Sequence, residues 1–268
     1  MGEVIGFVSL KGGVGKTTLA AAIASELANQ HRKKVLLVDA NYSAPNLGLH
    51  MDIIAPAVSV HDVLNGKRLS SAVHEKFGVD VVPGNFLFSR QFSPMKLRSK
   101  LSRARNVYDY IILDASPSLS DEVFSSLLAS DRLFIVTTPD YPSLSCCMKT
   151  ARIAKQRGKE ISGIIVNRVI DRKFQVGLEE IQESTGIPVI AMIGEDKNVH
   201  RALIERMPVN LTRRNSSFSR EIKKIGNTLA GKKERRSVLR EVFFKNYSKD
   251  EVNRELLRQS FYQSIFKK

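Results

Sequence analysis

Short apolar runs alternate with helical stretches along most of the chain. The apolar runs cover residues 3–10, 34–40, 79–84, 108–116, 132–139, 161–169 and 188–195. Their consecutive positions are apolar, which is typical of strands buried on both faces of a sheet. Residues 15–30 and 143–158 carry helical patterns. This alternation predicts an α/β fold with a mostly parallel central sheet flanked by helices, and ligands bind at the carboxyl ends of such strands.

The pattern changes after Gly231. The charged run Lys-Lys-Glu-Arg-Arg occupies residues 232–236, and two amphipathic helices are predicted beyond it, with Ser248 and Glu251 as a capping box. Their apolar stripes comprise Val238, Leu239, Val242, Phe243 and Tyr247 in the first helix, and Val252, Leu256, Leu257, Phe261, Ile265 and Phe266 in the second. The sequence therefore predicts a globular domain at 1–231 and a basic amphipathic helical extension at 232–268.

Charge is concentrated at the C-terminal end of the chain. The formal net charge is +15, and residues 211–268 hold 16 Lys and Arg against 6 Asp and Glu. A basic extension indicates an anionic partner, which is membrane lipid, nucleic acid or an acidic protein. A solvated helical surface is the simpler alternative.

Cysteine content and hydropathy exclude two classes of protein. Cys146 and Cys147 are the only cysteines, and adjacent cysteines form neither a disulfide framework nor a metal-ligand pattern. No apolar run approaches the ~18 residues of a membrane span, and the N-terminus lacks the basic flank of a signal peptide. We therefore expect a cytoplasmic protein, which would be peripheral on the inner face of the cell membrane if its basic extension binds lipid.

The segment from Lys11 to Thr18, KGGVGKTT, follows the first predicted strand and opens an Ala-rich helix. This is the context of a P-loop, in which backbone N–H groups surround phosphate oxygens. We expect phosphate contacts from the segment's backbone and from Lys16, and a hydroxyl ligand to Mg²⁺ from Thr17. The predicted binding residues are Gly12, Gly13, Val14, Gly15, Lys16, Thr17 and Thr18, and the predicted cofactors are ATP and Mg²⁺.

The combination KGGxGKT resembles the deviant Walker A motif of the MinD/ParA family of ATPases. A Leu occupies position 10, where the usual Walker motif has Gly, and Lys11 takes the place of the family's signature lysine. The resemblance implies that Lys11 reaches across an ATP-bound homodimer to the phosphates of the partner subunit. A second cation there would neutralise charge that develops in phosphoryl transfer. An ordinary solvated lysine is the alternative.

The same resemblance assigns the acidic residues of the site. The strand ending at Asp39 matches the family's switch I, and "YDYIILDASPSL" matches Walker B and switch II, with Asp114 as a ligand of Mg²⁺ through water. The family pattern gives Asp39 a place in the Mg²⁺ shell. It has a second Asp at position 41 to orient the attacking water, but this chain has Asn41. Asn can hydrogen-bond water but cannot take its proton, so we expect slow hydrolysis.

Two further segments resemble the family's base-binding elements. "IIVNRV" places Asn167 against the adenine edge and Arg168 beside the ring, and an Asn that serves a turn is the alternative reading. "AMIGEDKNVHRAL" resembles the family's adenine loop, which brings in Glu195 and Asp196. Gly194 stands where the family has Pro.

The resemblance favours the MinD-like branch. "PNLGLHMDI" and "VSVHDVLNG" look like MinD, and the Asp-Pro-Gln-Gly stretch of ParA proteins is absent. We therefore expect an ATP-dependent switch that dimerises and positions or recruits an unknown protein partner, with residues 237–268 on an anionic membrane. The alternatives are a ParA-like DNA-partitioning ATPase, for which nonspecific DNA is the less favoured partner, and a non-hydrolysing adapter. An iron–sulfur carrier is disfavoured because helical neighbours such as Cys146 and Cys147 point about 100° apart.

Overall fold

The computed structural model describes residues 1–170 and 175–232. One eight-stranded sheet forms its centre, with strand order β3-β4-β2-β5-β1-β6-β7-β8. The strands are β1 (Glu3–Val8), β2 (Val35–Ala40), β3 (His74–Lys76), β4 (Val79–Val82), β5 (Tyr110–Ala115), β6 (Arg132–Thr137), β7 (Glu160–Val169) and β8 (Val189–Gly194). All pairs are parallel except β3 with β4. The predicted fold class and the seven predicted strands are confirmed.

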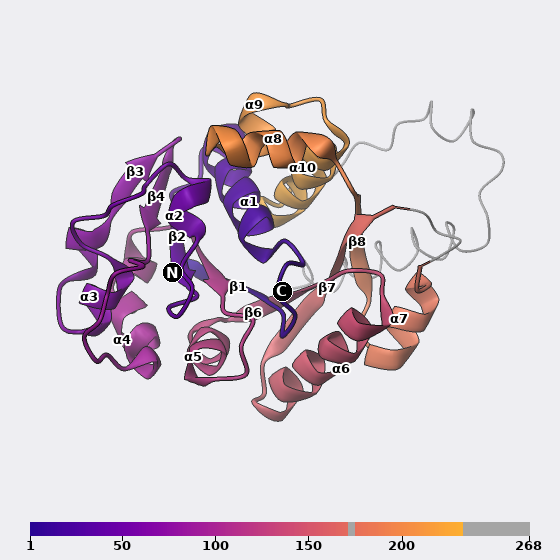
Figure 1. Ribbon diagram of the computed structural model, residues 1–268, viewed down its shortest axis with the longest axis horizontal. Coiled ribbons are helices and arrows are strands. Elements are labelled where there is room, and N and C mark those ends of the chain that lie inside the picture. Colours follow the sequence, from indigo (N-terminus) through magenta and orange to yellow (C-terminus); the bar gives the residue numbers. More distant parts are fainter. Residues whose placement is uncertain (171–174, 233–268) are drawn as a thin grey trace.

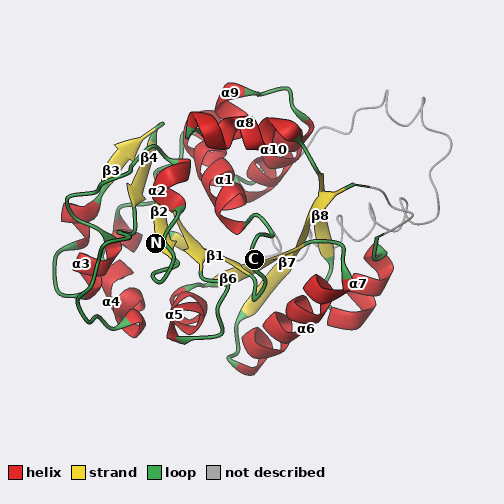
Figure 2. Ribbon diagram, in the orientation of Figure 1, coloured by secondary structure: helices red, strands yellow, loops and turns green. Residues whose placement is uncertain are grey.

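Helices cover both faces of the sheet (Figure 1). They are α1 (Lys16–His31), α2 (Leu47–His50), α3 (Val60–Leu64), α4 (Leu97–Leu101), α5 (Asp121–Ala129), α6 (Tyr141–Gln156), α7 (Leu178–Thr185), α8 (Lys197–Glu205), α9 (Val209–Thr212) and α10 (Ser217–Leu229), with short 3₁₀ turns at Leu69–Ala72, Pro94–Lys96 and Ala104–Asn106. The upper layer of Figure 2 holds α1, α8, α9 and α10, and α5, α6 and α7 lie below the sheet.

Strand residues alternate between the two layers while remaining buried. In β2, Leu37 packs into the cluster around α1 and α10, whereas Leu36 and Val38 pack into the cluster with α3 and α4. On the upper face, Phe218 of α10 is 1% exposed within the cluster that contains α1. Two-sided burial explains why the strands are apolar at every position.

The last described helix ends at the amino edge of the sheet. The Tyr110 hydroxyl, at the start of β5, donates a 2.6 Å hydrogen bond to the carbonyl of Leu229 in the last turn of α10. The extension therefore begins at the edge opposite the carboxyl ends of the parallel strands. The predicted helices of residues 237–268, and the extension at 232–268 apart from Lys232, lie outside the described residues.

Candidate functional site

The loop between β1 and α1 is shaped by two glycines in the left-handed region. Gly13 has φ 77° and Gly15, the residue before α1, has φ 96°. A Cβ atom on Gly15 would lie 2.3 Å from Nδ2 of Asn167, whereas one on Gly12 would meet nothing within 4 Å. Gly15 is therefore required both by its backbone conformation and by the close approach of β7. The loop forms a cradle at the N-terminus of a 16-residue helix, where anions are favoured.

Two lysines meet at this loop. Lys16 is 7% exposed, and its ammonium donates a 3.4 Å hydrogen bond to the backbone carbonyl of Lys11. Burial lowers the pKa of Lys16, and the carboxylate of Asp114 opposes that shift. The Lys11 side chain is partly exposed. The charge of Lys11 also acts on Asp140, before α6. Burial raises the pKa of Asp140, but hydrogen bonds from Thr138 and Ser143, together with the Lys11 charge, hold that pKa below its usual value.

Two carboxylates lie side by side at the ends of neighbouring strands. Asp39 of β2 and Asp114 of β5 are paired in register, and both are at most 1% exposed. Asp39 accepts 3.1 Å hydrogen bonds from the N–H groups of Asn41 and Leu47. Burial, and then the charge of Asp114, raise the pKa of Asp39 well above its usual value. Burial raises the pKa of Asp114 to about 6, against the opposing effects of the Thr17 hydroxyl and the Lys16 ammonium.

The buried Asp114 carboxylate has no hydrogen-bond partner on either of its oxygens among residues 1–170 and 175–232. Buried carboxylates are normally paired or coordinate a metal. A divalent cation held by Asp114, Asp39 and the Thr17 hydroxyl would satisfy this group, since carboxylate and hydroxyl oxygens suit Mg²⁺. The residues present therefore fit Mg²⁺ with a nucleotide phosphate.

Thr17 and Asn41 already have partners within the protein. The Thr17 hydroxyl donates a 3.0 Å hydrogen bond to Oδ1 of Asn46, in the segment that follows β2. Asn41 is 7% exposed, and its amide donates a 2.6 Å hydrogen bond to the carbonyl of Ala44. The Ser43 hydroxyl donates to the Glu122 carboxylate of α5. Asn46 and Glu122 were not predicted as site residues, because their spacing from the P-loop carries no motif.

The predicted base-binding residues converge on the same loop. Asn167 donates a 2.8 Å hydrogen bond to the carbonyl of Val14, and Arg168 Nη1 donates to the carbonyl of Gly13 at 3.2 Å. Arg168 also pairs with Glu195 at 2.9 Å. The structure thus brings the ends of β7 and β8 against the cradle. Thr18 lies partly exposed in the first turn of α1.

The Asp196 carboxylate has a structural role in this arrangement. It accepts hydrogen bonds from the backbone N–H groups of Asn198 and Phe218 and from the Ser217 hydroxyl, and so caps α8 and ties it to α10. Although burial opposes the shift, these bonds lower the pKa of Asp196 to about 2. A contact of the Asp196 backbone with nucleotide stays a prediction.

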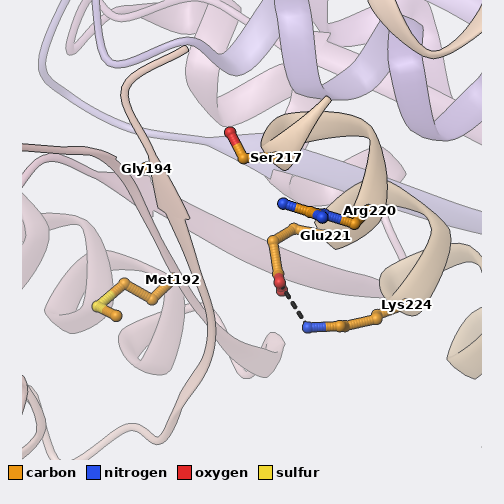
Figure 3. A pocket seen from close by; sticks show the side chains of 6 residues that line it. All are labelled: Met192, Gly194, Ser217, Arg220, Glu221 and Lys224. Carbon is orange, nitrogen blue, oxygen red and sulfur yellow. Dashed lines mark hydrogen bonds and ion pairs between the residues drawn. The ribbon is translucent and has the colours of Figure 1, made fainter. Parts of the chain in front are cut away.

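A cavity of about 440 Å³ lies beside this capped segment, between β8 and α10 (Figure 3). It is lined by Met192, Gly194, Ser217, Arg220, Glu221 and Lys224, and Glu221 pairs with Lys224 across its wall. None of the P-loop residues lines it. The phosphate cradle is therefore a separate feature of the surface.

Comparison with known proteins identifies the family. The family model of an AAA domain matches residues 2–163. An uncharacterized ATP-binding protein of Methanocaldococcus jannaschii is 32% identical over 237 residues, covering 87% of this chain and 89% of that protein. The septum site-determining protein MinD of Pyrococcus horikoshii OT3, complexed with Mg-ADP, superimposes with a TM-score of 0.80 at 27% identity, covering 92% of this chain and all of that one. The chain belongs to the MinD/ParA family of P-loop ATPases.

A third MinD/ParA relative is similar over nearly its whole length. MinD of Aquifex aeolicus, in a MinC:MinD cell division protein complex, has a TM-score of 0.77 at 25% identity, covering 87% of this chain and 98% of that one.

Within the part of the chain that the structure describes, no helix meets the length and hydropathy needed to cross a membrane. No cluster of three or more His, Cys, Asp or Glu that could hold a metal occurs among those residues either. Cys147 is buried in α6, and Cys146 is partly exposed.

Replacing Asp114 by Asn should stabilise the nucleotide-free protein. The pKa of Asp114 is higher in the folded protein than in the unfolded chain, so the native state binds the proton more tightly. The free energy of unfolding should therefore fall between about pH 4 and pH 6 and stay low above that. A pKa of about 6 in place of 3.8 corresponds to about 3 kcal/mol at neutral pH. Urea unfolding of the wild type and Asp114→Asn at pH 7 measures the difference.

The same substitution should abolish the extra thermal stability that Mg²⁺ adds to the ADP-bound protein. Asp80→Asn, at the partly exposed start of β4, is the control and should keep it. An Asp114→Asn protein that is less stable without nucleotide, or that keeps the Mg²⁺ effect, contradicts this account of the buried carboxylate.

Proposed function

We propose that this chain is an ATP-dependent molecular switch that dimerises with ATP, hydrolyses it slowly, and positions or recruits a protein partner. The observation that carries the proposal is the convergence of the P-loop with a pair of buried carboxylates, Asp39 and Asp114, one of which has no partner among the described residues. Such a site binds a phosphate chain together with a divalent cation. The nucleotide is ATP, as the family membership supports.

Each residue of the site has a defined task in this proposal. Backbone N–H groups from Gly12 to Thr18 hold the phosphates, and Lys16 adds charge at the terminal phosphates. Asp39, Asp114 and the Thr17 hydroxyl hold Mg²⁺, which supplies charge stabilisation for phosphoryl transfer. Asn167 and Arg168, with the backbone at Glu195 and Asp196, receive the base. Lys11 extends toward the phosphates of a partner subunit.

Asn41 sets the rate of hydrolysis in this scheme. Its amide can position a water molecule but cannot accept a proton, and it donates a hydrogen bond to the carbonyl of Ala44. Positioning and charge lower most of the barrier in phosphoryl transfer, so a slow rate is retained. The ATP-bound state is therefore long-lived.

Asn41→Asp should raise ATP turnover by about tenfold or more, within the range of a single general base. Steady-state phosphate release measures it, with Lys16→Ala as the control that loses ATP binding. A wild type that already turns over rapidly, or an Asn41→Asp protein with unchanged turnover, contradicts the role given to Asn41.

Lys11→Ala should separate ATP binding from dimerisation. The variant keeps Lys16 and the glycines, so ATP affinity should change by less than about threefold while the ATP-dependent dimer is lost. Light scattering after gel filtration, with ATP and with ADP, measures the mass. Lys34→Ala, at an exposed lysine before β2, is the matched control and should dimerise normally. A Lys11→Ala protein that still dimerises assigns the lysine to its own subunit.

The basic extension is proposed to dock on anionic membrane once two subunits are paired. A single amphipathic helix binds weakly, and two on one dimer add through effective concentration. Lys and Arg residues around the apolar stripe suit an anionic surface. The MinC:MinD complex of A. aeolicus supports the further proposal that a protein partner is recruited.

The full chain should co-sediment with phosphatidylglycerol vesicles in ATP and not in ADP. The double substitution Phe261→Asp with Ile265→Asp, on the apolar stripe, should abolish sedimentation. Asn253→Asp with Gln263→Asp adds the same charge at polar positions and should retain most of it. Equal loss in both variants would show that charge alone acts. ATP-dependent binding to random duplex DNA, weakening steeply with salt, would instead favour a ParA-like partitioning function.

A further inference from the structure

An aromatic cluster lies beneath the segment that follows β2. His61 of α3 stacks on Phe88, with ring centres 4.9 Å apart and planes 18° from parallel. Phe92 meets the edge of His61 at 5.1 Å and the ring of Tyr42 at 5.6 Å. Tyr42 lies in the segment after β2, and both phenylalanines lie in the loop after β4. His61 therefore packs between two loops that are far apart in sequence.

His61 also hydrogen-bonds both loops. Its Nδ1 accepts a 3.2 Å hydrogen bond from the backbone N–H of Asn85, and its Nε2 lies 2.9 Å from the carbonyl of Tyr42. A carbonyl only accepts, so Nε2 carries the proton and Nδ1 is free to accept. The residue is 2% exposed, and burial lowers its pKa, which favours this neutral form. The His61 imidazole thus donates one hydrogen bond to the segment after β2 and accepts one from the loop after β4.

The backbones of both loops also contact the Asp39 carboxylate. The N–H of Asn41, next to Tyr42, donates to Oδ1 of Asp39. Gly84, next to Asn85, is so close to Asp39 that an added Cβ atom would lie 3.4 Å from its Oδ2, and the Gly84 backbone hydrogen bond lowers the Asp39 pKa. In each segment the residue that contacts Asp39 is followed directly by the residue that contacts His61. His61 therefore connects the two segments immediately beside their contacts with Asp39.

Further hydrogen bonds hold the elements that surround His61 in place. The capping box of Ser59 and Asp62 fixes the start of α3, and the N–H of Val60 donates to the carbonyl of Pro83 at 2.8 Å. In α5, Ser125 donates to the carbonyl of Pro94 at 2.5 Å, which ties the far end of the loop to α5. The exposed tip lies between these anchors, where Phe86 is 58% and Leu87 is 90% exposed.

We propose that His61 is a positioning residue that joins the segment after β2 to residues 84–93, so that a change at Asp39 moves both together. Occupation of the Asp39 site would then be transmitted to the exposed Phe86–Leu87 tip, which makes residues 84–93 a third nucleotide-responsive segment beside switch I and switch II. The effect on turnover rests on the ATPase function proposed above, whereas the coupling of the two loops does not. His61 acts through Tyr42 and Asn85 and does not touch the nucleotide.

Hydrogen–deuterium exchange tests the coupling without hydrolysis. Adding Mg-ADP to the full-length wild type should slow amide exchange about tenfold in residues 41–46 and in residues 84–93. In His61→Leu, which keeps bulk but removes both hydrogen bonds, the effect should persist in 41–46 and fall to less than twofold in 84–93. His74→Leu is the matched control, because His74 also bonds a carbonyl, that of Val58 at 3.3 Å, yet lies on β3. It should respond as the wild type does.

Two conservative variants separate the two bonds. His61→Asn keeps an acceptor near Nδ1 for Asn85, and His61→Gln keeps a donor near Nε2 for Tyr42, so each should restore part of the response. If the His61→Leu protein does not bind Mg-ADP, the exchange experiment is carried out with His61→Asn and His61→Gln instead. The proposal is overturned if Mg-ADP does not slow amide exchange of residues 84–93 in the wild type. It is also overturned if Mg-ADP still slows that exchange in His61→Leu as much as in the wild type.

The kinetic arm separates this proposal from the proposed function. His61→Leu should lower the kcat for ATP about tenfold with less than twofold change in KM, whereas a purely structural histidine would lower the amount of active protein and leave kcat per bound nucleotide unchanged. A wild type with no turnover contradicts the ATPase function alone, because the exchange experiment still decides the coupling. An intact kcat per site in His61→Leu overturns its positioning role in turnover.

Discussion

The burial of two neighbouring carboxylates is the constraint on which the rest of the structure depends. Asp39 and Asp114 face the same low-dielectric end of the sheet, in register on adjacent strands. Their mutual repulsion and loss of hydration destabilise the folded chain unless a cation or proton neutralises them. The Lys16 ammonium, itself buried, supplies part of that compensation. Mg²⁺ and phosphate bound at this site would relieve that electrostatic cost together.

The surrounding loops are organised around this pair. The N–H groups of Asn41 and Leu47 and the backbone of Gly84 converge on Asp39, whereas Asp114 receives no comparable set among the described residues. One carboxylate is thus held by the protein and the other is left for a ligand. The segments after β2 and β4 both contact the carboxylate that is held, so the proposed coupling of these two loops would pass through Asp39.

The fold was predictable where local pattern and burial agree. Two-sided burial gives β1, β2 and β5 an apolar residue at nearly every position, and Gly13 and Gly15 mark the cradle because only glycine suits their backbone. Strand β3 has the polar sequence His-Glu-Lys and exists because it pairs with β4, so no periodicity announces it. The bonds of Asp196 to Ser217 and Phe218, and both hydrogen bonds of His61, depend on residues 19 or more positions away in sequence. The contact of the Asp196 loop with adenine through its backbone stays a prediction, whereas the capping of α8 by the Asp196 carboxylate was not predicted.

The position of the end of α10 has a consequence for signalling. Leu229 is bonded to the first residue of β5, while Asp114 lies near the end of the same strand. The proposed nucleotide site and the end of α10 thus lie at opposite ends of β5, a strand that is buried at every position after Tyr110. Under the proposed function, pairing two subunits would change how many extensions are available to one surface, and the strand between the two ends need not deform. The proposed switch would then signal bound ATP through the number of paired extensions, without a change of shape along the strand.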